Sequence, residues 1–423
     1  MDLGFRRFII RLFNDSEYGS SEFMSKKKAL QVIKWRVFHA WLSLKAWKVR
    51  RKDRIRFGFL IQELTQWKTE SLYREMLAHP RFDPILCISP SRGYPGAESV
   101  LVDYCKEKGY GYFLLDPGKT IVEQIDLDMV VPEKPYLSEI HRQHQIDRNK
   151  RILYVVIPYY LSTITEDWVV NQRHNLLCWR QFVDNESCRK TWAKAQMLKG
   201  INYAVTGLPV MDELLTPKEE LPDVWPVSDG RKRIIFAPHH TISDLHMEGI
   251  GYSTFLDYCD VMLEMRDKYA AQAYFVFKPH PSLRNRLSKL WGEEETEAYY
   301  RKWEKPGVSH VEEGKYLALF KHSDALIHDC GSFTVEYMYM DHPVMYLVRD
   351  EGHTANMIPY AREAFDLHYK GRCADDIERF IQAVIEGNDP LQEKRAAFKQ
   401  EHLLPPNGRT ACENIIRCIL GYK

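Results

Sequence analysis

The stretch AYFVFKPHPS, residues 273–282, decides the fold of this chain. Five apolar residues, enough for a short buried strand, give way at once to the proline-flanked polar cluster KPHPS (278–282). A second apolar run, ALI at 325–327, opens in the same way onto HDCGS at 328–332. Neither cluster helps a sheet to form, so both indicate a function placed where strands end.

Strand-like and helix-like segments alternate on both sides of this stretch. The predicted strands are 55–61, 83–89, 111–116, 128–132, 151–159, 202–207, 233–238, 273–279, 324–329 and 344–348. The predicted helices are 69–80, 97–108, 136–145, a stretch near 175–199, 252–269, one from about 333, and three near the end, the last over 409–422. This alternation predicts right-handed crossovers and parallel sheets.

The order of the segments predicts two doubly wound α/β domains. A stretch rich in proline and charge, 214–233, is typical of an interdomain linker, and 423 residues are too many for one ordinary core. The predicted parts are an N-terminal extension (1–53), a first Rossmann-like domain (54–213), a second (232–405) and a C-terminal helix (406–423). Ligands of such folds bind beyond the carboxyl ends of the strands, so we expect a site in the crevice between the halves.

The composition is that of a folded, soluble protein. It is 45% hydrophobic and 28% charged with a net charge of +1, and no stretch approaches the roughly 20 apolar residues of a membrane span. The N-terminus lacks the pattern of a secretory leader, and the nine cysteines show no CxxC spacing, which favours a reducing cytosol and disfavours structural zinc. The 13% aromatic content, with ten Trp, fits either carbohydrate handling or dense packing.

Residues 24–54 form a basic segment. It contains eleven Lys or Arg against one acid, Asp53, interleaved with Trp35, Trp41 and Trp47. A basic helix with interfacial Trp is typical of an element that lies on an anionic membrane surface. The alternative is a solvated helix that packs its aromatic residues on the first domain. No nucleic-acid motif follows, so nucleic acid is not an expected partner. Residues 1–23 are expected to be poorly structured and of uncertain origin.

Three polar clusters follow predicted strands of the second half. His239 and His240 follow the strand at 233–238, and Lys278 and His280 follow the next. Lysine offers a point charge to a phosphate, and histidine can act as general base or acid near neutral pH. A single histidine at a strand end is more often structural, whereas three clusters at one sheet edge favour an active site.

The third cluster, HDCGSFTVE (328–336), precedes a predicted helix. Gly331, Ser332 and Phe333 at its start suit phosphate binding through amide groups, although Ser332 could be only an N-cap and Gly331 only a turn residue. Glu336 could reach a ribose hydroxyl or be solvated, and Asp329 could orient a histidine or cap the backbone. The spacing matches no HxxxH or HExxH metal motif, no GxSxG nucleophile and no Walker loop. We therefore expect no metal ligands and no cofactor, and the sequence leaves open whether the reaction depends on a metal ion.

The ordered motifs APHH, KPHP and HDCGS resemble the CDP-glycerol glycerophosphotransferase family of teichoic-acid and capsule polymerases and primases. FGFLIQELTQWKTESLYREM (57–76), DLDMVVPEKPY (126–136), ILYVVIPYYL (152–161), AVTGLPVMD (204–212) and NGRTACENIIRCI (407–419) extend the resemblance over roughly 54–421. The sequence departs from the family at Gly331, where a serine is common, at the added His328, and at Pro238-His239-His240-Thr241.

The resemblance implies a GT-B fold with two domains facing a central cleft and a C-terminal helix that returns to the N-terminal domain. It implies a donor, CDP-glycerol or CDP-ribitol, held by the second half through Lys278, Pro279, Asp329, Gly331, Ser332, Phe333 and Glu336. His239 or His240 would be the base that takes the proton of an acceptor hydroxyl, and His280 would stabilise the donor pyrophosphate or the leaving group. The acceptor would be a glycan or lipid-linked polymer, and the enzyme would be cytoplasmic and peripheral on the inner face of the plasma membrane.

Two other hypotheses remain open at this point. One is a nucleotide-sugar glycosyltransferase or a sugar epimerase on the same fold, and the other is a non-catalytic scaffold that binds glycan or lipid. Loss of membrane association on deletion of residues 24–54 would count against an epimerase. Full retention of the biological role by a His280→Ala variant would favour a scaffold.

Overall fold

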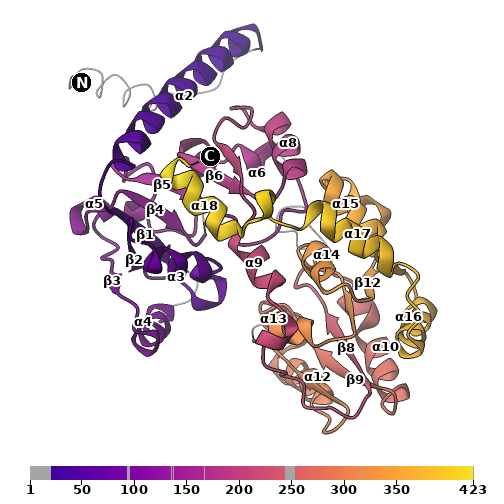
Figure 1. The fold of residues 1–423 in the computed structure, drawn as a ribbon. Helices are drawn as coiled ribbons and strands as arrows, with labels where there is room; N and C mark the ends of the chain where they lie inside the picture. The colour runs from indigo at the N-terminus through magenta and orange to yellow at the C-terminus, as the bar shows by residue number, and fades with distance from the viewer. Residues whose placement is uncertain are drawn as a thin grey trace. The chain divides into compact units, whose positions relative to one another are not determined.

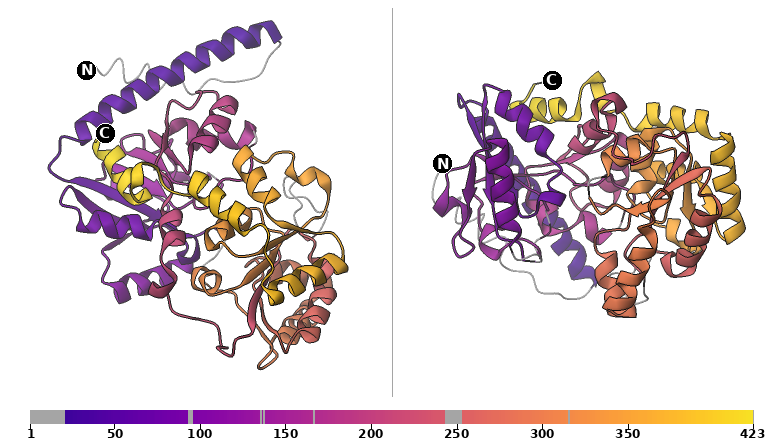
Figure 2. Two further views of the ribbon diagram at one scale, coloured as in Figure 1. Left: turned by 45° about the vertical axis from the view of Figure 1, so that its right-hand side comes forward. Right: turned by 90° about the horizontal axis from the view of Figure 1, so that it is seen from below.

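The computed structural model describes residues 21–92, 96–134, 136, 138–165, 167–242, 253–314 and 316–422. The chain forms two compact units. Unit 1 comprises residues 1–159, 165–210 and 405–423, and unit 2 comprises 160–164 and 211–404. Helices flank the strands in each unit (Figures 1 and 2). The predicted disorder of 1–23 falls almost wholly outside the described residues.

Unit 1 contains a seven-stranded sheet in the order β3-β2-β1-β4-β5-β6-β7, and every pairing in it is parallel. Its strands are β1 (Ile55–Ile61), β2 (Phe82–Ile88), β3 (Tyr112–Leu114), β4 (Met129–Pro132), β5 (Leu153–Val156), β6 (Arg180–Val183) and β7 (Tyr203–Val205). Its helices are α2 (Ser21–Val49), α3 (Glu70–Ala78), α4 (Ala97–Lys108), α5 (Ile121–Gln124), α6 (Asp167–Val170), α7 (Arg173–Leu177), α8 (Glu186–Ala195) and α18 (Ala411–Leu420), with 3-10 turns η1 (Leu64–Gln66), η2 (Arg142–His144) and η6 (Pro406–Gly408).

Unit 2 contains a six-stranded parallel sheet in the order β10-β9-β8-β11-β12-β13. Its strands are β8 (Lys232–Ala237), β9 (Ala273–Phe277), β10 (Ser309–Val311), β11 (Ala325–His328), β12 (Val344–Leu347) and β13 (Tyr369–Gly371). Its helices are α10 (Phe255–Lys268), α11 (Leu283–Trp291), α12 (Glu293–Trp303), α13 (Leu317–Lys321), α14 (Phe333–Glu336), α15 (Pro359–Asp366), α16 (Ala374–Glu386) and α17 (Gln392–His402). The 3-10 turns are η3 (Lys218–Glu220), η4 (Tyr337–Met340) and η5 (Glu351–Thr354), and α9 (Pro209–Leu215) joins the two units.

Both sheets have the strand order of a doubly wound Rossmann fold. Across each sheet, the first three strands of the unit lie in the order third, second, first, and the fourth strand lies next to the first. The order therefore reverses between β1 and β4 in unit 1 and between β8 and β11 in unit 2. Ligands of such sheets bind outside the carboxyl ends of the strands at this reversal. His239 and His240 follow β8, and HDCGS ends β11. The clusters found in the sequence therefore flank the point where the fold places a ligand.

A packed aromatic core supports the site edge of unit 2. The rings of Phe277 and Trp303 stack with centroids 5.0 Å apart, and Phe236 stacks on Phe277 at 5.7 Å. All three side chains are fully buried, and six Trp in the described residues are core positions: Trp35, Trp67, Trp179, Trp192, Trp225 and Trp303. Dense packing therefore accounts for much of the high aromatic content, and the excess of Trp gives little support to carbohydrate handling.

Two of the expected helices are wrong. In 136–145, the described residues form only the short turn η2, because polar side chains there bond to distant groups. The ring of His144 is fully buried between the Ser89 hydroxyl, at 2.8 Å, and the Asp116 carbonyl, at 3.0 Å. The stretch near 175–199 is interrupted by the strand β6. This strand has only four residues, so it is hard to recognise in the sequence.

The C-terminal helix α18 belongs to unit 1. Thr410 caps it in a capping box with Glu413, in which the Glu413 amide donates to the Thr410 hydroxyl at 3.1 Å. The Asn414 side chain ties it to β7 by donating to the Thr206 carbonyl at 3.3 Å. The predicted return of the last helix to the N-terminal unit is confirmed (Figure 2).

Candidate active site

Three histidines meet at the carboxyl edge of the unit 2 sheet. Ring centroids lie 4.3 Å apart for His239 and His240, 4.2 Å for His240 and His280, and 5.1 Å for His239 and His280. We call these three residues the histidine cluster. The backbone holds it together, since the His280 amide donates to the Pro238 carbonyl at 3.1 Å. The convergence expected from APHH and KPHP is present.

All three rings are neutral at pH 7 in the free protein. Burial lowers the pKa of His240 to about 4 and that of His280 to about 3, and the pKa of His239 lies well below 6.5. Positive charge adds to the effect of burial, from Arg286 on all three rings and from Lys278 on His280. A neutral imidazole can accept a proton, so the cluster can supply a general base without first losing one.

His280 is oriented as a hydrogen-bond donor. Its Nδ1 accepts a hydrogen bond from the Ser282 amide at 3.1 Å, so the neutral ring carries its proton on Nε2. The Nε2–H can therefore donate to an anionic oxygen but cannot take a proton from a hydroxyl. His239 differs, because its Nδ1 lies 3.0 Å from the Thr241 hydroxyl, which can donate or accept. The Nδ1 of His240 is buried and has no partner in the described part of the chain.

Asp329 fixes the backbone beside the histidine cluster. It is fully buried at the end of β11, and its carboxylate accepts from the His239 amide at 2.5 Å, the Thr254 amide at 2.7 Å and the Thr254 hydroxyl at 3.1 Å. Burial raises its pKa to about 6 despite these bonds. Of the two roles open from the sequence, these contacts fit the capping of backbone groups, because the carboxylate accepts from the backbone amides of His239 and Thr254.

Two cations accompany the cluster. The Lys278 side chain is 5% exposed, and its amide donates to the Phe236 carbonyl at 2.7 Å. Arg286 lies in the first turn of α11, five residues after KPHP, and its charge acts on all three histidines. Arg286 was not predicted from the sequence, although its position in the helix that follows KPHP was a usable signal. The positive charges of Lys278 and Arg286, together with the Nε2–H that His280 can donate, suit the binding of a diphosphate.

The residues at the start of α14 are placed less favourably for phosphate. The helix has only four residues before the 3-10 turn η4, so its dipole is small. The Ser332 side chain makes no capping bond, and Phe333 packs its ring on Phe320, at 4.9 Å, and on Tyr316. A phosphate role for Gly331, Ser332 and Phe333 stays a prediction.

Glu336 is buried rather than solvated. It is 3% exposed and accepts a hydrogen bond from the Tyr316 hydroxyl at 2.7 Å. The interpretation of Glu336 as a solvated helix residue is therefore wrong, while the ribose contact stays a prediction. Pro279 is buried directly after β9, where it fixes the path of the chain between Lys278 and His280.

His328 and Cys330 are structural. The His328 ring is fully buried, and its Nδ1 accepts from the Cys330 amide at 3.1 Å. The Cys330 thiol donates to the Ala237 carbonyl at 3.3 Å, and burial raises its pKa well above the usual value. A thiol that holds its proton so firmly is no nucleophile, which agrees with its interpretation as a small buried residue.

The histidine cluster also has the composition of a metal site. One ring nitrogen from each histidine can be chosen so that all three lie within 4.8 Å of one another. The charge of Arg286 acts on all three rings and that of Lys278 on His280, and both would repel a dication. We therefore keep the prediction that the site uses no metal.

A second polar cluster marks the reversal of strand order in unit 1. One carboxylate oxygen of Glu133, after β4, accepts from the Gln62 amide at 2.7 Å and the Glu63 amide at 3.1 Å, both after β1. Its other oxygen is buried without a partner among the described residues, and burial raises its pKa to about 7. Lys134, 7% exposed, is ion-paired to Glu63 at 3.1 Å and to Glu139 at 3.0 Å.

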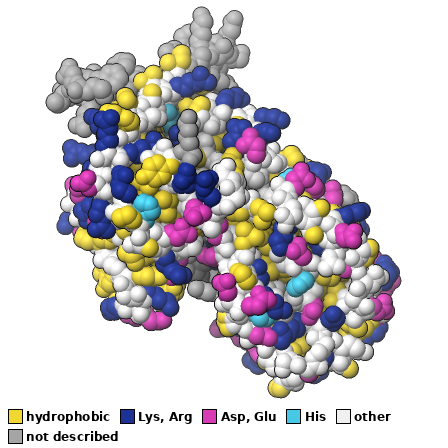
Figure 3. Space-filling view, viewed as in Figure 1, with side chains coloured by type: hydrophobic (Ala, Val, Ile, Leu, Met, Phe, Trp, Pro, Cys, Tyr) yellow, Lys and Arg dark blue, Asp and Glu magenta, His cyan; other side chains and the backbone are white. Residues whose placement is uncertain are grey.

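Helix α2 has two opposite apolar faces. One face is buried on unit 1 and contains Trp35, Phe38, Leu42, Ala46 and Val49. The other is exposed and contains Ile33 (58%), Val37 (41%), Leu44 (56%) and Trp47 (48%), at helical spacing. We call these four residues the exposed stripe. The packing interpretation of the basic segment is confirmed for the buried face, while the membrane-surface interpretation stays a prediction for the exposed one. In Figure 3, Lys and Arg side chains lie together with hydrophobic ones over α2. No described helix is long and apolar enough to cross a membrane.

Two Rossmann-like parallel sheets in one chain, with a charged site at the strand ends of the second, define the GT-B class. The chain is similar to a variant of the wall teichoic acid polymerase TagF, with a TM-score of 0.60 and 13% identity over 95% of this chain and 98% of that one. It is also similar to UDP-GlcNAc 2-epimerase from Neisseria meningitidis bound to UDP-GlcNAc, with a TM-score of 0.54 and 14% identity over 86% and 99% of the two chains. At such identities the likeness shows the fold alone, and the predicted GT-B fold is confirmed.

Residues 113–421 match the family described as CDP-Glycerol:Poly(glycerophosphate) glycerophosphotransferase, and the chain belongs to this family. Curated relatives are the teichoic acid ribitol-phosphate polymerases TarL and TarK of Staphylococcus aureus, which are 25% identical over 252 residues and 24% identical over 242. These matches cover 57% and 55% of this chain but 41% and 43% of the relatives. The chain thus matches about two fifths of the length of these relatives. The resemblance seen in the sequence is confirmed.

Proposed function

We propose that the protein transfers glycerol phosphate or ribitol phosphate from a CDP-activated donor to a hydroxyl of a cell-surface glycan or a teichoic-acid- or capsule-type polymer, with release of CMP. Membership of the family supports this class of reaction. The single observation that carries the proposal is the histidine cluster beside Lys278 and Arg286 at the reversal of strand order. Neutral bases, a donating ring and two cations are the groups that phosphoryl transfer requires.

The chemistry divides among these residues. The acceptor hydroxyl oxygen attacks the β-phosphorus and forms the new P–O bond, while the bond from this phosphorus to the bridging oxygen breaks and CMP leaves with the electron pair. The hydroxyl proton passes to His239 or His240. His280 donates from Nε2 to a phosphate oxygen, as its tautomer allows, and Lys278 and Arg286 offset the charge of the donor.

A bound donor changes the protonation of the cluster. In the free protein the pKa of His240 is about 4, too low for an efficient base at pH 7. Burial lowers this pKa most, and Arg286 adds to the effect. A pyrophosphate brings negative charge to Arg286 and to the rings, so donor binding raises the pKa of the base toward neutrality. The base therefore gains strength when the donor is in place.

We further propose that the enzyme is cytoplasmic and works as a peripheral protein on the inner face of the plasma membrane, where a lipid-linked acceptor would be found. The exposed stripe of α2 supplies an apolar face, and the exposed Arg36 and Lys48 flank it. The Arg51 guanidinium lies 3.5 Å from the centroid of the Trp47 ring, which joins charge and aromatic surface at one end. Apolar insertion with basic flanks suits an anionic bilayer.

Flotation with vesicles tests the membrane part. We expect wild-type protein to float with phosphatidylglycerol-containing vesicles and the variant Leu44→Ser/Trp47→Ser to remain in the dense fraction. Leu290→Ser is the matched control, because Leu290 is 52% exposed on unit 2 and lies outside α2. Equal flotation of the α2 variant and wild type would contradict the membrane proposal.

A thermal-shift screen of CDP-glycerol, CDP-ribitol, UDP-GlcNAc and GDP-mannose tests the donor class. A ligand at 100 times its dissociation constant adds about 2.7 kcal/mol of stability, which a melting curve resolves. We expect stabilisation by the CDP-linked donors alone, reduced in His280→Asn. Stabilisation by UDP-GlcNAc alone would favour a glycosyltransferase or epimerase, and no response to any nucleotide would favour a scaffold.

A further inference from the structure

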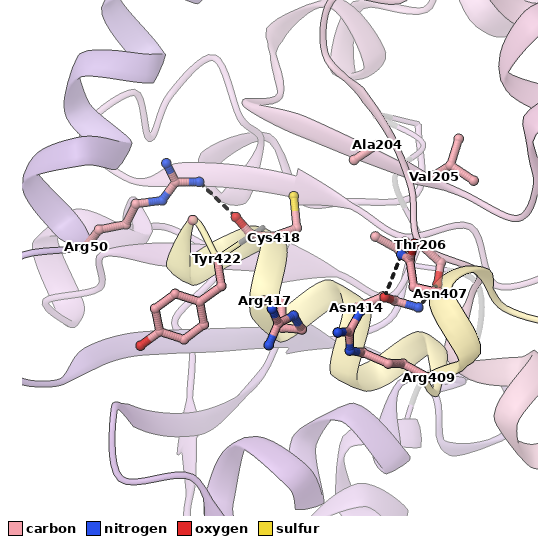
Figure 4. Close-up of a pocket in the computed structure, with 11 residues that line it drawn as sticks. Arg50, Ala204, Val205, Thr206, Asn407, Arg409, Asn414, Arg417, Cys418 and Tyr422 are labelled. Carbon is pink, nitrogen blue, oxygen red and sulfur yellow. Dashed lines mark hydrogen bonds between the residues drawn. The ribbon is translucent and has the colours of Figure 1, made fainter.

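A second charged site lies in unit 1. A cavity of about 370 Å³ opens between β7, α18 and the residues that follow α2. Its lining consists of Arg50, Ala204, Val205, Thr206, Asn407, Arg409, Asn414, Arg417, Cys418, Gly421 and Tyr422 (Figure 4). Three of these side chains are arginines, and none of the lining residues is acidic. We call this site the arginine cavity.

Arg50 is fixed in place at one end of the cavity. Its Nε donates to the Ile419 carbonyl at 2.8 Å. Its Nη2 donates to the Cys418 carbonyl at 2.8 Å (Figure 4). Its guanidinium also lies 5.3 Å from the centroid of the Trp179 ring. Burial lowers the pKa of Arg50, and nearby Arg180 lowers it too. The two bonds to carbonyls at the end of α18 hold the guanidinium at the cavity, so its positive charge is fixed there.

The other two arginines lie at the α18 side of the cavity. Arg417 is half-buried, 5.9 Å from the centroid of the Tyr422 ring. Arg409 is exposed immediately before the Thr410 cap of α18. Between them, the Asn414 side chain is fixed by donating to the Pro406 carbonyl at 2.8 Å and accepting from the Asn407 amide group at 3.3 Å. Figure 4 shows these polar groups along one wall.

We propose that the arginine cavity binds a phosphate ester. Guanidinium groups pair with phosphate through two parallel hydrogen bonds, and a lining with three positive charges and no negative one favours an anion of matching charge. A cavity of about 370 Å³ is at the small end of ligand sites. It suits one polyol-phosphate unit better than a whole nucleotide diphosphate. The cavity belongs to unit 1, whereas the histidine cluster belongs to unit 2.

The phosphate ester has two possible sources, and naming them rests on the proposed function. One is a phosphodiester of the growing polyol-phosphate chain, which would be held here while its end reacts. The other is the phosphate of a phospholipid headgroup, since Arg50 directly follows α2. Both present a glycerol-phosphate-like diester, and a soluble and a vesicle-borne probe separate them.

The test compares binding of two probes to the full chain. One is a soluble, fluorescently labelled glycerol-phosphate oligomer, and the other is a vesicle of phosphatidylglycerol and phosphatidylcholine. The variants are Arg409→Gln and Arg417→Gln, with Arg148→Gln as the control because Arg148 is exposed on unit 1 outside the cavity. Arg50 is left intact, since it also holds the end of α18.

We expect each cavity variant to weaken binding of one probe about tenfold and the control to leave it unchanged, because a hydrogen bond to a charged group is worth about this factor. Weaker binding of the oligomer by the cavity variants identifies the growing polyol-phosphate polymer as the source of the phosphate ester. Weaker binding of the vesicles identifies the phospholipid headgroup. Unchanged binding of both probes would overturn the proposal. Binding is measured without donor, so the two proposals can fail separately. Unchanged probe binding in the cavity variants, with CMP release intact, contradicts the phosphate-ester site alone. Weakened probe binding without any CMP release contradicts the proposed function alone.

Discussion

Replacing Asp329 with Asn separates two contributions to stability: the hydrogen bonds that the buried carboxylate accepts, and the cost of burying its negative charge. The carboxylate accepts three hydrogen bonds from His239 and Thr254, and Asn can keep an acceptor for only part of this set. One buried donor left without an acceptor costs about 1–3 kcal/mol. In the other direction, a pKa raised from 3.8 to about 6 means that holding the ionised carboxylate in the fold costs about 3 kcal/mol.

The sign of the pH dependence follows from proton binding. Between pH 3.8 and about 6 the folded protein holds more protons at Asp329 than the unfolded chain, so its contribution to the free energy of unfolding falls as the pH rises through this window. Asn does not titrate. We therefore expect Asp329→Asn to be less stable than wild type by about 1–3 kcal/mol near pH 4 and equal to it or slightly more stable at pH 8.

Urea unfolding of both proteins at pH 4.5, 6 and 8, followed by tryptophan fluorescence, measures this difference. Thr334→Val is a matched control, because its buried hydroxyl donates to the Cys330 carbonyl at 3.2 Å and does not titrate. A stability difference between wild type and Asp329→Asn that stays constant from pH 4.5 to pH 8 would contradict this prediction, because it would mean that Asp329 does not titrate with a raised pKa in the folded protein.

Three further predictions follow from the titrating groups and the cations. For the wild-type enzyme, the acid limb of kcat should lie at higher pH than that of kcat/KM, because donor charge raises the low pKa of His240, and coincident limbs in a pH–rate profile would contradict this. Glu133→Gln should gain up to about 3 kcal/mol of stability relative to wild type between pH 4.5 and 7 in urea titrations, because the wild-type carboxyl, with its pKa near 7, loses stability as the pH rises through that window. Incubation with EDTA should leave the rate unchanged, because Lys278 and Arg286 already supply the positive charge, whereas loss of activity restored by a divalent cation would show that the histidine cluster holds a metal.

The sequence predicted the elements whose pattern is strong. Long apolar runs such as IRFGFLI and AYFVF became β1 and β9, because a strand buried on both faces needs apolar residues throughout. The short strands β6, β10 and β13 went unrecognised. They contain three or four residues with Arg, His or Lys among them, and they form only by pairing with strands already in place. Tertiary hydrogen bonds of His144 likewise replaced a local helix that the sequence allowed.

The sequence was enough to predict which polar clusters form the site, but not the detailed geometry of their side chains. Parallel strands end at one edge, so APHH, KPHP and HDCGS had to approach one another once the alternation was recognised. The tautomer of His280 depends on the hydrogen bond from the Ser282 amide, and the effect of Arg286 on the histidines depends on the position of α11. Neither can be predicted from the local sequence. The two apolar faces of α2 explain why its residues showed no single hydrophobic side.

Acceptor-dependent release of CMP by the full chain tests the proposed function directly. With CDP-glycerol or CDP-ribitol and a lipid-linked glycan, wild type should form CMP, and His280→Asn and a His239→Asn/His240→Asn variant should lose about a hundredfold or more of the rate. His402→Asn, a histidine of α17 outside the cluster, should retain it. No CMP from either donor, or full activity in the cluster variants, would contradict the central claim that this histidine cluster carries out the transfer.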